Sequence, residues 1–391
     1  MMITLEKAIE LALSNAVQTT IEYISYIQSL QRVLGEDIRS DIDIPPFNKS
    51  AMDGYAFQKS DIEKTLKIIQ TIQAGDKPVA LLKQGECVKI MTGARIPENA
   101  DYVAKVEDTS LNKNGEVLIN RVESKSNIRY AAEDIKKNEK VLSKGTLIRP
   151  QEMATLATVG AIRVPVYKKP TVVIASTGNE LTEPENIPNE TQIRNSNAYQ
   201  LVAQCQQMGI LADYMGIIPD TLNDTIEHLK QMLIEANVVL LSGGVSMGDF
   251  DFVPQALISL GFEIIFHAIS VQPGKPTLMA KKGNKYCFGL PGNPVSAYMQ
   301  FELLVKPFIY KMMGHEYQPA TCWLPLAKSV SRKNAERTSL IPVKIIDNKI
   351  YPVIYHGSAH LLALNNADGF MMIPINIKEI QQDTYVTVRP L

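Results

Sequence analysis

One short segment combines groups that could bind both an anion and a metal ion. In VVLLSGGVSMGDFDFVP, which begins at Val238, four apolar residues lead directly into Ser242, Gly243 and Gly244. Glycines at a strand end let the backbone approach a ligand and turn its N–H groups toward an anion. The polar side chains that follow belong to Ser246, Asp249 and Asp251. Two other interpretations stay open, a tight turn without a ligand and, for Asp251, a helix cap.

Three further segments have polar or glycine residues where an apolar run ends. IASTGNEL ends in Thr177 and Gly178 with Glu180 close behind, and QPGKPT holds Lys275 between glycine and proline. A lysine fixed in this way suits a phosphate, although a solvated turn has the same pattern. In GLPGNPVS, Asn-Pro is a favoured helix start whose free N–H groups attract anions. Its residues of interest are Pro291, Gly292, Asn293, Pro294 and Ser296.

The N-terminal half carries weaker signals of the same kind. PPFNKSAMDGYAF places Asp53 before a glycine, and KIMTGARIP places Thr92 after a β-rich run. NIRYAAEDI carries Asp134 among other charges. An Asp-Gly pair is ordinarily a turn, and a charged run is ordinarily a solvated surface.

The elements expected around the first group form a doubly wound sheet. Between residues 169 and 316, short β-branched runs alternate with helical patterns of 10–15 residues. This alternation predicts a parallel sheet with helices on both faces. In such sheets ligands bind beyond the carboxyl ends of the strands, at the point where the strand order reverses.

The rest of the chain predicts a fold of class α/β plus β with several domains. Helical and extended pieces at 1–43 and 132–168 form a discontinuous N-terminal domain, with one helix over 4–16 and another from Pro150 to Gly160. Residues 44–131 form an inserted antiparallel β domain, 169–316 the doubly wound domain, and 317–391 a small C-terminal β domain.

Composition excludes several classes of partner. The net charge is −1 and 45% of the residues are hydrophobic, which argues against nucleic acid or an anionic membrane surface. No apolar run approaches the length of a membrane span, and the N-terminus reads as an amphipathic helix rather than a signal peptide. The four cysteines are far apart, which favours reduced core residues in a cytoplasmic protein. Without a Cys/His cluster, any metal ligands should be oxygens.

Taken together, these segments resemble one family, the molybdopterin molybdenumtransferases (MoeA), and the related C-terminal domain of gephyrin. The resemblance covers nearly the whole chain. It is carried, in order, by PPFNKSAMDGYAF, MTGARIP, NIRYAAEDI, ASTGNEL, IRNSNAYQL, SGGVSMGDFDFV, QPGKPT and GLPGNPVSAYMQFELLVKPFI.

The resemblance implies an activity. The family inserts molybdate into the dithiolene of adenylylated molybdopterin and releases AMP, with Mg²⁺ as the cation. It implies four domains, the doubly wound one binding the pterin nucleotide, and a homodimer whose cleft combines this domain with the partner's N-terminal domains. The molybdopterin adenylyltransferase is a possible partner protein. The resemblance leaves the choice between molybdate and tungstate open.

The family's functional residues are carried over onto matching positions. The resemblance implies catalytic roles for Asp53, Thr92, Asp134, Glu180 and Asp251, with Asp220 of IIPDT and Asp251 as metal ligands. It implies that the pterin nucleotide is bound by Thr177, Gly178, Ser242, Gly243, Gly244, Ser246, Lys275, Pro291, Gly292, Asn293, Pro294 and Ser296. Two positions depart from the family pattern: Ala132 stands where glycine is frequent, and Asn179 where an acid is frequent.

Two rival functions remain. A molybdopterin adenylyltransferase would share the doubly wound domain but would not need the two β domains. A non-catalytic gephyrin-like scaffold would bind a partner peptide, but it would not need the acidic residues.

Overall fold

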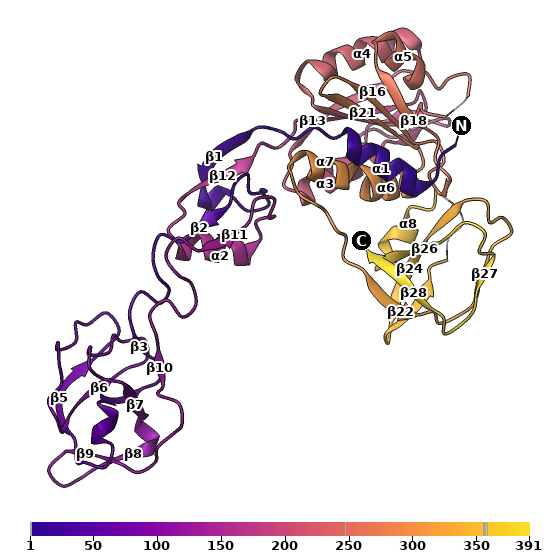
Figure 1. Ribbon diagram of the computed structural model, residues 1–391. Helices are drawn as coiled ribbons and strands as arrows, with labels where there is room; N and C mark the ends of the chain where they lie inside the picture. The colour runs from indigo at the N-terminus through magenta and orange to yellow at the C-terminus, as the bar shows by residue number, and fades with distance from the viewer. Residues whose placement is uncertain (1, 247, 355–356, 358) are drawn as a thin grey trace.

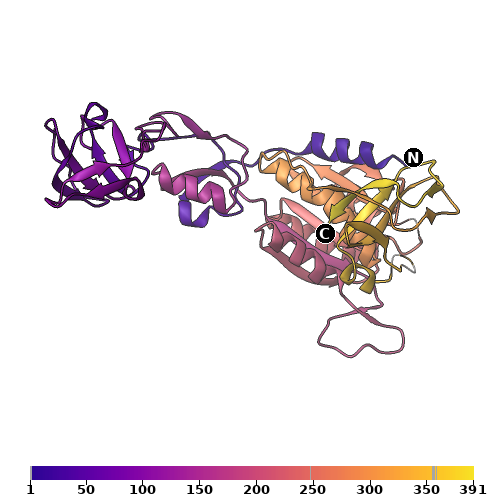
Figure 2. The same cartoon turned by 90° about the horizontal axis from the view of Figure 1, so that it is seen from below.

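The computed structural model describes residues 2–246, 248–354, 357 and 359–391, and the chain in it is elongated. A β domain lies at one end, a small mixed domain follows, and the sheet domain and the C-terminal β domain lie together at the other end (Figure 1). Seen from the second direction, the segment between β14 (Leu181–Thr182) and β15 (Ile193–Arg194) projects from the sheet domain (Figure 2).

The sheet domain is built on six strands. Their order is β16 (Ala212–Ile218), β13 (Val172–Thr177), β17 (Val238–Ser242), β21 (Lys285–Leu290), β20 (Leu278–Lys282) and β18 (Glu263–His267). The helices are α3 (Asn197–Gln207), α4 (Leu222–Glu235), α5 (Val253–Ser259), α6 (Pro294–Gln300) and α7 (Lys306–Met312), with a π-helical turn, Phe301–Val305, joining the last two. The predicted alternation of strands and helices is therefore confirmed.

Only part of the sheet is parallel. The four strands from β16 to β21 are parallel, whereas β20 and β18 run antiparallel to their neighbours. The physical reason is the short link between β20 and β21, a hairpin turn at Gly283, because parallel strands need a longer crossover. The run FEIIFHAISV is also not one strand. Ala268 has φ +76°, and β19 (Val271–Gln272) leaves to pair with the C-terminal β domain.

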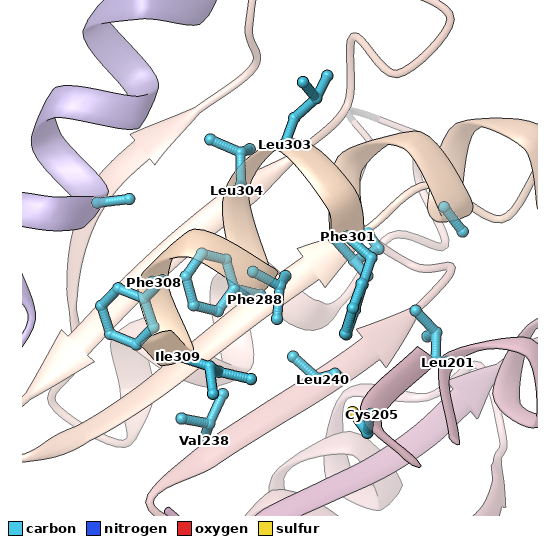
Figure 3. Close-up of a cluster of buried hydrophobic side chains, with 14 of the residues drawn as sticks. Leu201, Cys205, Val238, Leu240, Phe288, Phe301, Leu303, Leu304, Phe308 and Ile309 are labelled. Atoms are coloured by element: carbon cyan, nitrogen blue, oxygen red, sulfur yellow. The ribbon is translucent and has the colours of Figure 1, made fainter. Parts of the chain in front are cut away.

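The central strands are buried on both faces. In β17, Val238 and Leu240 face one apolar cluster while Val239 and Leu241 face the other. This follows from the two-residue period of a strand, and it explains why the sequence is an unbroken apolar run. Figure 3 shows the first cluster, where side chains of α3 and of the α6–α7 helical segment meet those of β17 and Phe288. Fully burying each such side chain contributes about 1.5–3 kcal/mol.

The first helix belongs to this packing. Helix α1 (Leu5–Asn15) begins at the predicted cap, because the Thr4 hydroxyl accepts a hydrogen bond from the Lys7 N–H. Its buried face packs on the sheet domain's first cluster, and the Tyr286 hydroxyl donates to the Asn15 carbonyl. Helix α1 therefore packs apart from the remainder of the 1–43 segment.

The small mixed domain is held by pairs of distant segments. Strand β1 (Ile21–Ser25) pairs antiparallel with β12 (Arg163–Tyr167), and β2 (Ile38–Arg39) pairs with β11 (Lys140–Leu142). Helix α2 (Pro150–Thr158) starts at the predicted proline. This pairing joins two parts of the chain that lie more than 100 residues apart in sequence into one domain.

The distal β domain has one four-stranded sheet. The order is β5 (Lys67–Ile72), β6 (Glu86–Ile90), β4 (Gly54–Phe57) and β7 (Tyr102–Lys105), with a separate hairpin of β8 (Thr109–Leu111) and β9 (Val117–Ile119). The expected antiparallel sheet is found except that β5 and β6 are parallel. The two-stranded ladder of β3 (Lys49–Ser50) and β10 (Ile128–Arg129) lies where the chain enters and leaves this domain.

The C-terminal β domain packs against the sheet domain. Its main sheet contains β22 (Cys322–Pro325), β24 (Thr338–Ile346), β25 (Lys349–Pro352), β26 (Gly369–Ile373) and β28 (Tyr385–Pro390), and its remaining elements are β23 (Val330–Ser331), β27 (Glu379–Ile380) and α8 (Leu362–Asn365). Arg389 donates to the carbonyl of Glu302 in the π-helical turn. This contact and β19 tie the two domains together.

Candidate active site

A cavity of about 590 Å³ lies at the carboxyl ends of the parallel strands. It is lined by the residues that follow β13, β17 and β21, including Thr177, Gly243 and Gly292. The chain moves from β13 to β16 on one side and then returns to β17 on the other, so the strand order reverses here. The predicted position of the ligand site, beyond the strand ends at the reversal, matches this cavity.

The two glycines after β17 are required by their immediate neighbours. Gly243 has φ +96° and Gly244 has φ +63°, a region that residues with a Cβ rarely adopt. A Cβ on Gly244 would stand 2.6 Å from the Thr177 hydroxyl oxygen, and one on Gly243 would stand 2.6 Å from the Thr177 carbonyl oxygen. The glycines therefore let the turn lie directly on the end of β13, which forms the floor of the cavity.

Two asparagines before and at the start of α3 fasten this floor. Ser176 donates from Oγ to Asn195 Oδ1 at 3.0 Å. The Asn197 amide donates at 2.7 Å both to Ser242 Oγ and to the Gly292 carbonyl. Neither asparagine was among the predicted site residues, although both stand in the segment IRNSNAYQL. Only their position opposite three strand ends reveals them.

The wall of the cavity is acidic. Its ionisable residues are Glu180, Asp220, Asp249, Asp251 and Arg194. Asp220 accepts from the Asn179 N–H at 3.0 Å, and Asn179 accepts in return from the Asp220 N–H. Asn179 departs from the family pattern at this position. Its side-chain oxygen accepts the hydrogen bond that a carboxylate here would also accept, but it carries no charge.

Asp251 is not the cap of α5. The cap residue is Phe252, whose side chain makes no capping hydrogen bond. Asp251 Oδ2 instead accepts from the Gly248 N–H at 2.8 Å, which folds the loop back on itself. The helix-cap interpretation of Asp251 is therefore wrong.

Several predicted ligand-binding residues lie outside the lining of this cavity. Ser246 and Lys275 are exposed and do not line it. Pro291 and Ser296 are buried beneath it and do not line it either. Gly178, Asn293 and Pro294 do line it, as do Ser242 and Glu180. Gly274, beside Lys275, serves packing, since a Cβ there would meet the Gln300 side chain at 2.2 Å.

Asp53 and Thr92 are brought together in the distal β domain. Asp53 Oδ1 accepts from the Thr92 N–H at 2.6 Å and from its hydroxyl at 2.8 Å. These two bonds hold the pKa of the Asp53 carboxyl below its ordinary value, the backbone bond being the larger cause. Both residues line a second cavity of about 560 Å³ with Lys105 and Arg121. Gly54 is not a turn residue but starts β4, where a Cβ would stand 1.9 Å from the Ala104 carbonyl oxygen.

Asp134 lies between these regions, near the joint of the distal and small mixed domains. Its N–H donates to the Ile44 carbonyl, and its side chain is exposed. Ala132, the second departure from the family pattern, has φ +59°. This backbone conformation explains why glycine is frequent there, and alanine in it costs about 1–2 kcal/mol.

The described residues contain no cluster of three His, Cys, Asp or Glu side chains arranged to hold a metal ion. The acids around the first cavity are spread over separate loops. A cation such as Mg²⁺ binds through one or two carboxylates and completes its coordination with phosphate oxygens and water. The charged donors among the described lining residues are carboxylates, and these fit such an ion.

The C-terminal β domain also reaches the cavity. Ala359 and Leu361 line it, beside Phe250, whose side chain is 73% exposed. None of these three residues was among the predicted site residues. Phe250 stands between the two predicted acids Asp249 and Asp251, but an apolar side chain there does not by itself indicate a ligand. The cysteines, by contrast, are as expected: all four are free, and Cys87, Cys205 and Cys287 are buried. Among the helices of the described chain, not one has the length and apolarity needed to cross a membrane.

The fold is that of an α/β protein with a cavity where the strand order reverses. Three family models match in order: the MoeA N-terminal region (domain I and II) at residues 3–160, the probable molybdopterin binding domain at 173–311, and the MoeA C-terminal region (domain IV) at 325–391.

Whole proteins are similar over the same length. The molybdopterin molybdenumtransferase of Staphylococcus epidermidis is 33% identical over 95% of this chain and 91% of its own length. That of Bacillus subtilis is 34% identical over 91% of this chain and 86% of its own length. A crystal structure of the molybdopterin biosynthesis MoeA protein from Pyrococcus horikoshii is 32% identical with a TM-score of 0.81, covering 100% of this chain and 99% of that one. The chain belongs to the molybdopterin molybdenumtransferase family, and it is an enzyme of that family.

Proposed function

We propose that this enzyme inserts molybdenum from molybdate into the dithiolene of adenylylated molybdopterin and releases AMP. The observation that carries the proposal is the cavity at the strand ends, in a chain that matches the molybdenumtransferase family along its whole length. The two β domains, matched by the N- and C-terminal family models, disfavour the alternative of an adenylyltransferase.

The charge of the cavity supports a need for a divalent cation. Four carboxylates face one guanidinium, Arg194, so an anionic substrate would be repelled without a cation. Asp220 and Asp251 are the residues that would hold Mg²⁺. The strands they follow, β16 and β17, are not neighbours as expected but lie on either side of β13, and both acids line the cavity. Mg²⁺ would supply neutralisation of the phosphate charge as the bond to AMP is cleaved.

The chain's own residues bind and orient the substrate. The turn of Gly243 and Gly244 gives a floor without side chains, and the loop of Gly292 and Asn293 closes it beside the start of α6. Glu180 stands on the wall above Gly178, where its carboxylate can orient water or molybdate. Lys275 and Ser246, outside the lining, would reach a ligand only where it extends past the cavity.

A homodimer would unite the two groups of functional residues. Asp53 and Thr92 lie in the distal β domain, which Figure 1 shows at the opposite end of the chain from the sheet domain, whose strand ends line the cavity. One chain cannot close its own distal domain onto this cavity in the observed arrangement. A two-fold dimer in which each distal domain serves the partner's cavity would place both groups on one substrate.

The state of the cysteines indicates the cellular compartment. Four free cysteines, three of them buried, favour a reducing compartment such as the cytoplasm. The molybdopterin adenylyltransferase, which would make the substrate, is a candidate partner for direct transfer.

The test is a reaction of the purified protein with adenylylated molybdopterin, molybdate and Mg²⁺, with AMP release followed by chromatography. We expect AMP release that needs both molybdate and Mg²⁺. Omission of each in turn is the control. AMP formation from ATP and molybdopterin, rather than release from the adenylylated substrate, would favour the adenylyltransferase instead.

A further inference from the structure

The segment from Asn195 to Asn197 connects three strand ends beneath the strand-end cavity. Asn195 accepts from Ser176 at the end of β13. Asn197 donates to Ser242 at the end of β17 and to the Gly292 carbonyl after β21. Asn195, Asn197, Ser176 and Ser242 are all at least nine-tenths buried. A single side-chain amide therefore sets the spacing between two of the loops that form the floor.

The same site contains two polar atoms whose hydrogen-bonding capacity is unused. Asn197 Oδ1 and Thr177 Oγ1 are covered and have no hydrogen-bond partner among the described residues. Thr177 is 6% exposed and Asn197 is 7% exposed, and both residues line the cavity. Buried polar atoms are nearly always paired, because leaving one unpaired costs free energy. Both atoms belong to residues that line one cavity, so a bound group that displaces the atoms now covering them would supply their missing partners.

We propose that Asn197 is a positioning residue for the substrate: its amide nitrogen fixes the Ser242 and Gly292 loops, and its carbonyl oxygen accepts from an N–H or O–H donor of the bound nucleotide, directly or through one water molecule. The proposal rests on the proposed function, in which a pterin nucleotide occupies this cavity. Phosphate and molybdate oxygens are only acceptors when ionised, so the donor belongs to a heterocycle or a sugar hydroxyl.

The chemistry of the side chain explains why asparagine is needed. A planar amide offers two N–H donors and one acceptor oxygen from the same short stem. Aspartate would place an oxygen against the Gly292 carbonyl and would lose both donors. Leucine has nearly the same shape but neither donor nor acceptor.

Gln204 provides a matched control on the same helix. Its amide donates to the Tyr298 carbonyl and to Glu302 Oε1, and its own Oε1 has no partner among the described residues. It is 4% exposed and does not line the cavity. Asn197→Leu and Gln204→Met therefore each remove a buried amide of the same kind, one at the cavity and one away from it.

The experiment measures the affinity of each variant for AMP in the presence of Mg²⁺ by calorimetry, the KM for adenylylated molybdopterin, and the melting temperature. We expect Asn197→Leu to weaken AMP binding about tenfold, which corresponds to about 1.4 kcal/mol, and to raise KM more than it lowers kcat. We expect Gln204→Met to lower the melting temperature while AMP affinity stays near that of the wild type. Should Asn197→Leu not fold, Ser242→Ala replaces it, with an expected loss of about threefold.

The outcomes separate the two proposals. An Asn197→Leu protein that melts earlier but binds AMP as the wild type does would overturn the positioning role and leave the proposed function intact. A wild-type protein that binds neither AMP nor adenylylated molybdopterin would overturn the proposed function first. Equal losses of AMP affinity in Asn197→Leu and Gln204→Met would also overturn the positioning role, because distance from the cavity would then not matter.

Discussion

The strand-end cavity and the Asp53–Thr92 pair differ in how their polar groups are supported. Around the cavity, buried side chains from three loops bond to one another, and the walls come from two domains. In the distal domain, one exposed carboxylate is held by the N–H and hydroxyl of a single exposed threonine. The cavity is thus preorganised, whereas the distal pair is simple and offers its carboxylate to solvent.

The difference suggests a division of labour. A preorganised floor can bind and orient a large substrate, because its groups lose little freedom on binding. An exposed carboxylate on a separate domain can contribute only when that domain meets the substrate. Within one chain the distal domain lies at the opposite end from the sheet domain (Figure 1), so in the proposed dimer the distal pair would meet the cavity of the partner.

The largest expected effect comes from mixing two impaired variants. We expect that Asp53→Asn and Asp251→Asn chains, each nearly inactive alone, recover about a quarter of wild-type activity after they are unfolded, mixed and refolded together. Half of the dimers then contain both chains, and each of those has one intact cleft. Wild-type protein treated in the same way is the control, and no recovery would mean that each cleft is built within one chain.

Asp251→Asn should affect the metal-dependent step alone. We expect AMP release to fall about a hundredfold at low Mg²⁺ and to recover partly at higher Mg²⁺, because a ligand charge is lost. The melting temperature should change little, since asparagine can still accept from the Gly248 N–H. Asp224→Asn, at the start of α4 and outside the cavity lining, is the control. Wild-type turnover of Asp251→Asn at low Mg²⁺ would remove Asp251 from the metal site.

Gly244→Ala should damage the floor of the cavity, whereas Gly283→Ala should not. Both glycines have a similar positive φ, +63° and +56°, so each substitution costs about 1–2 kcal/mol of unfolding free energy from the backbone alone. A Cβ at Gly283 meets nothing within 4 Å, but one at Gly244 collides with Thr177. We expect an additional loss of about tenfold in kcat/KM for Gly244→Ala only. Equal kinetics for the two variants would contradict a floor set by this contact.

The smallest effect concerns the distal pair. Thr92→Val removes the hydroxyl bond to Asp53 but keeps the N–H bond, so the pKa of Asp53 should rise toward its ordinary value of 3.8 without reaching it. A carboxyl with a lowered pKa stabilises the fold above its unfolded pKa, and this contribution is lost as the pH falls through the folded pKa. The acid limit of the distal domain should therefore move to higher pH in Thr92→Val.

An NMR titration of the Asp53 carboxyl carbon measures this change. Thr71→Val, at an exposed position on β5 of the same domain, is the control. An unchanged Asp53 midpoint in Thr92→Val would show that the backbone N–H alone determines the pKa.

The sequence by itself determined the alternation of strands and helices in the sheet domain and the location of the cavity at its strand ends. The runs 172–175 and 238–241 are apolar because both faces are covered, and glycines follow the strand ends because a side chain would collide there. Each of these requirements acts on a single position and restricts the residue type that can occupy it. The strand-end cavity was therefore predictable from glycine, hydroxyl and acidic residues at the ends of apolar runs.

Only the tertiary structure decided which of these residues meet. Lys275 and Ser246 stand in segments like those of the lining residues, yet their loops turn them outside the cavity. Asn195 and Asn197 look like ordinary residues at a helix start, and they gain their partners from strands about 20 to 95 positions away. The antiparallel direction of β20 and β18 depends on how the chain reverses between these strands. Leu361 lines the cavity because the C-terminal domain folds back onto the sheet domain. Hydrogen bonds and close contacts between distant segments depend on the path of the whole backbone, and local residue types do not encode that path.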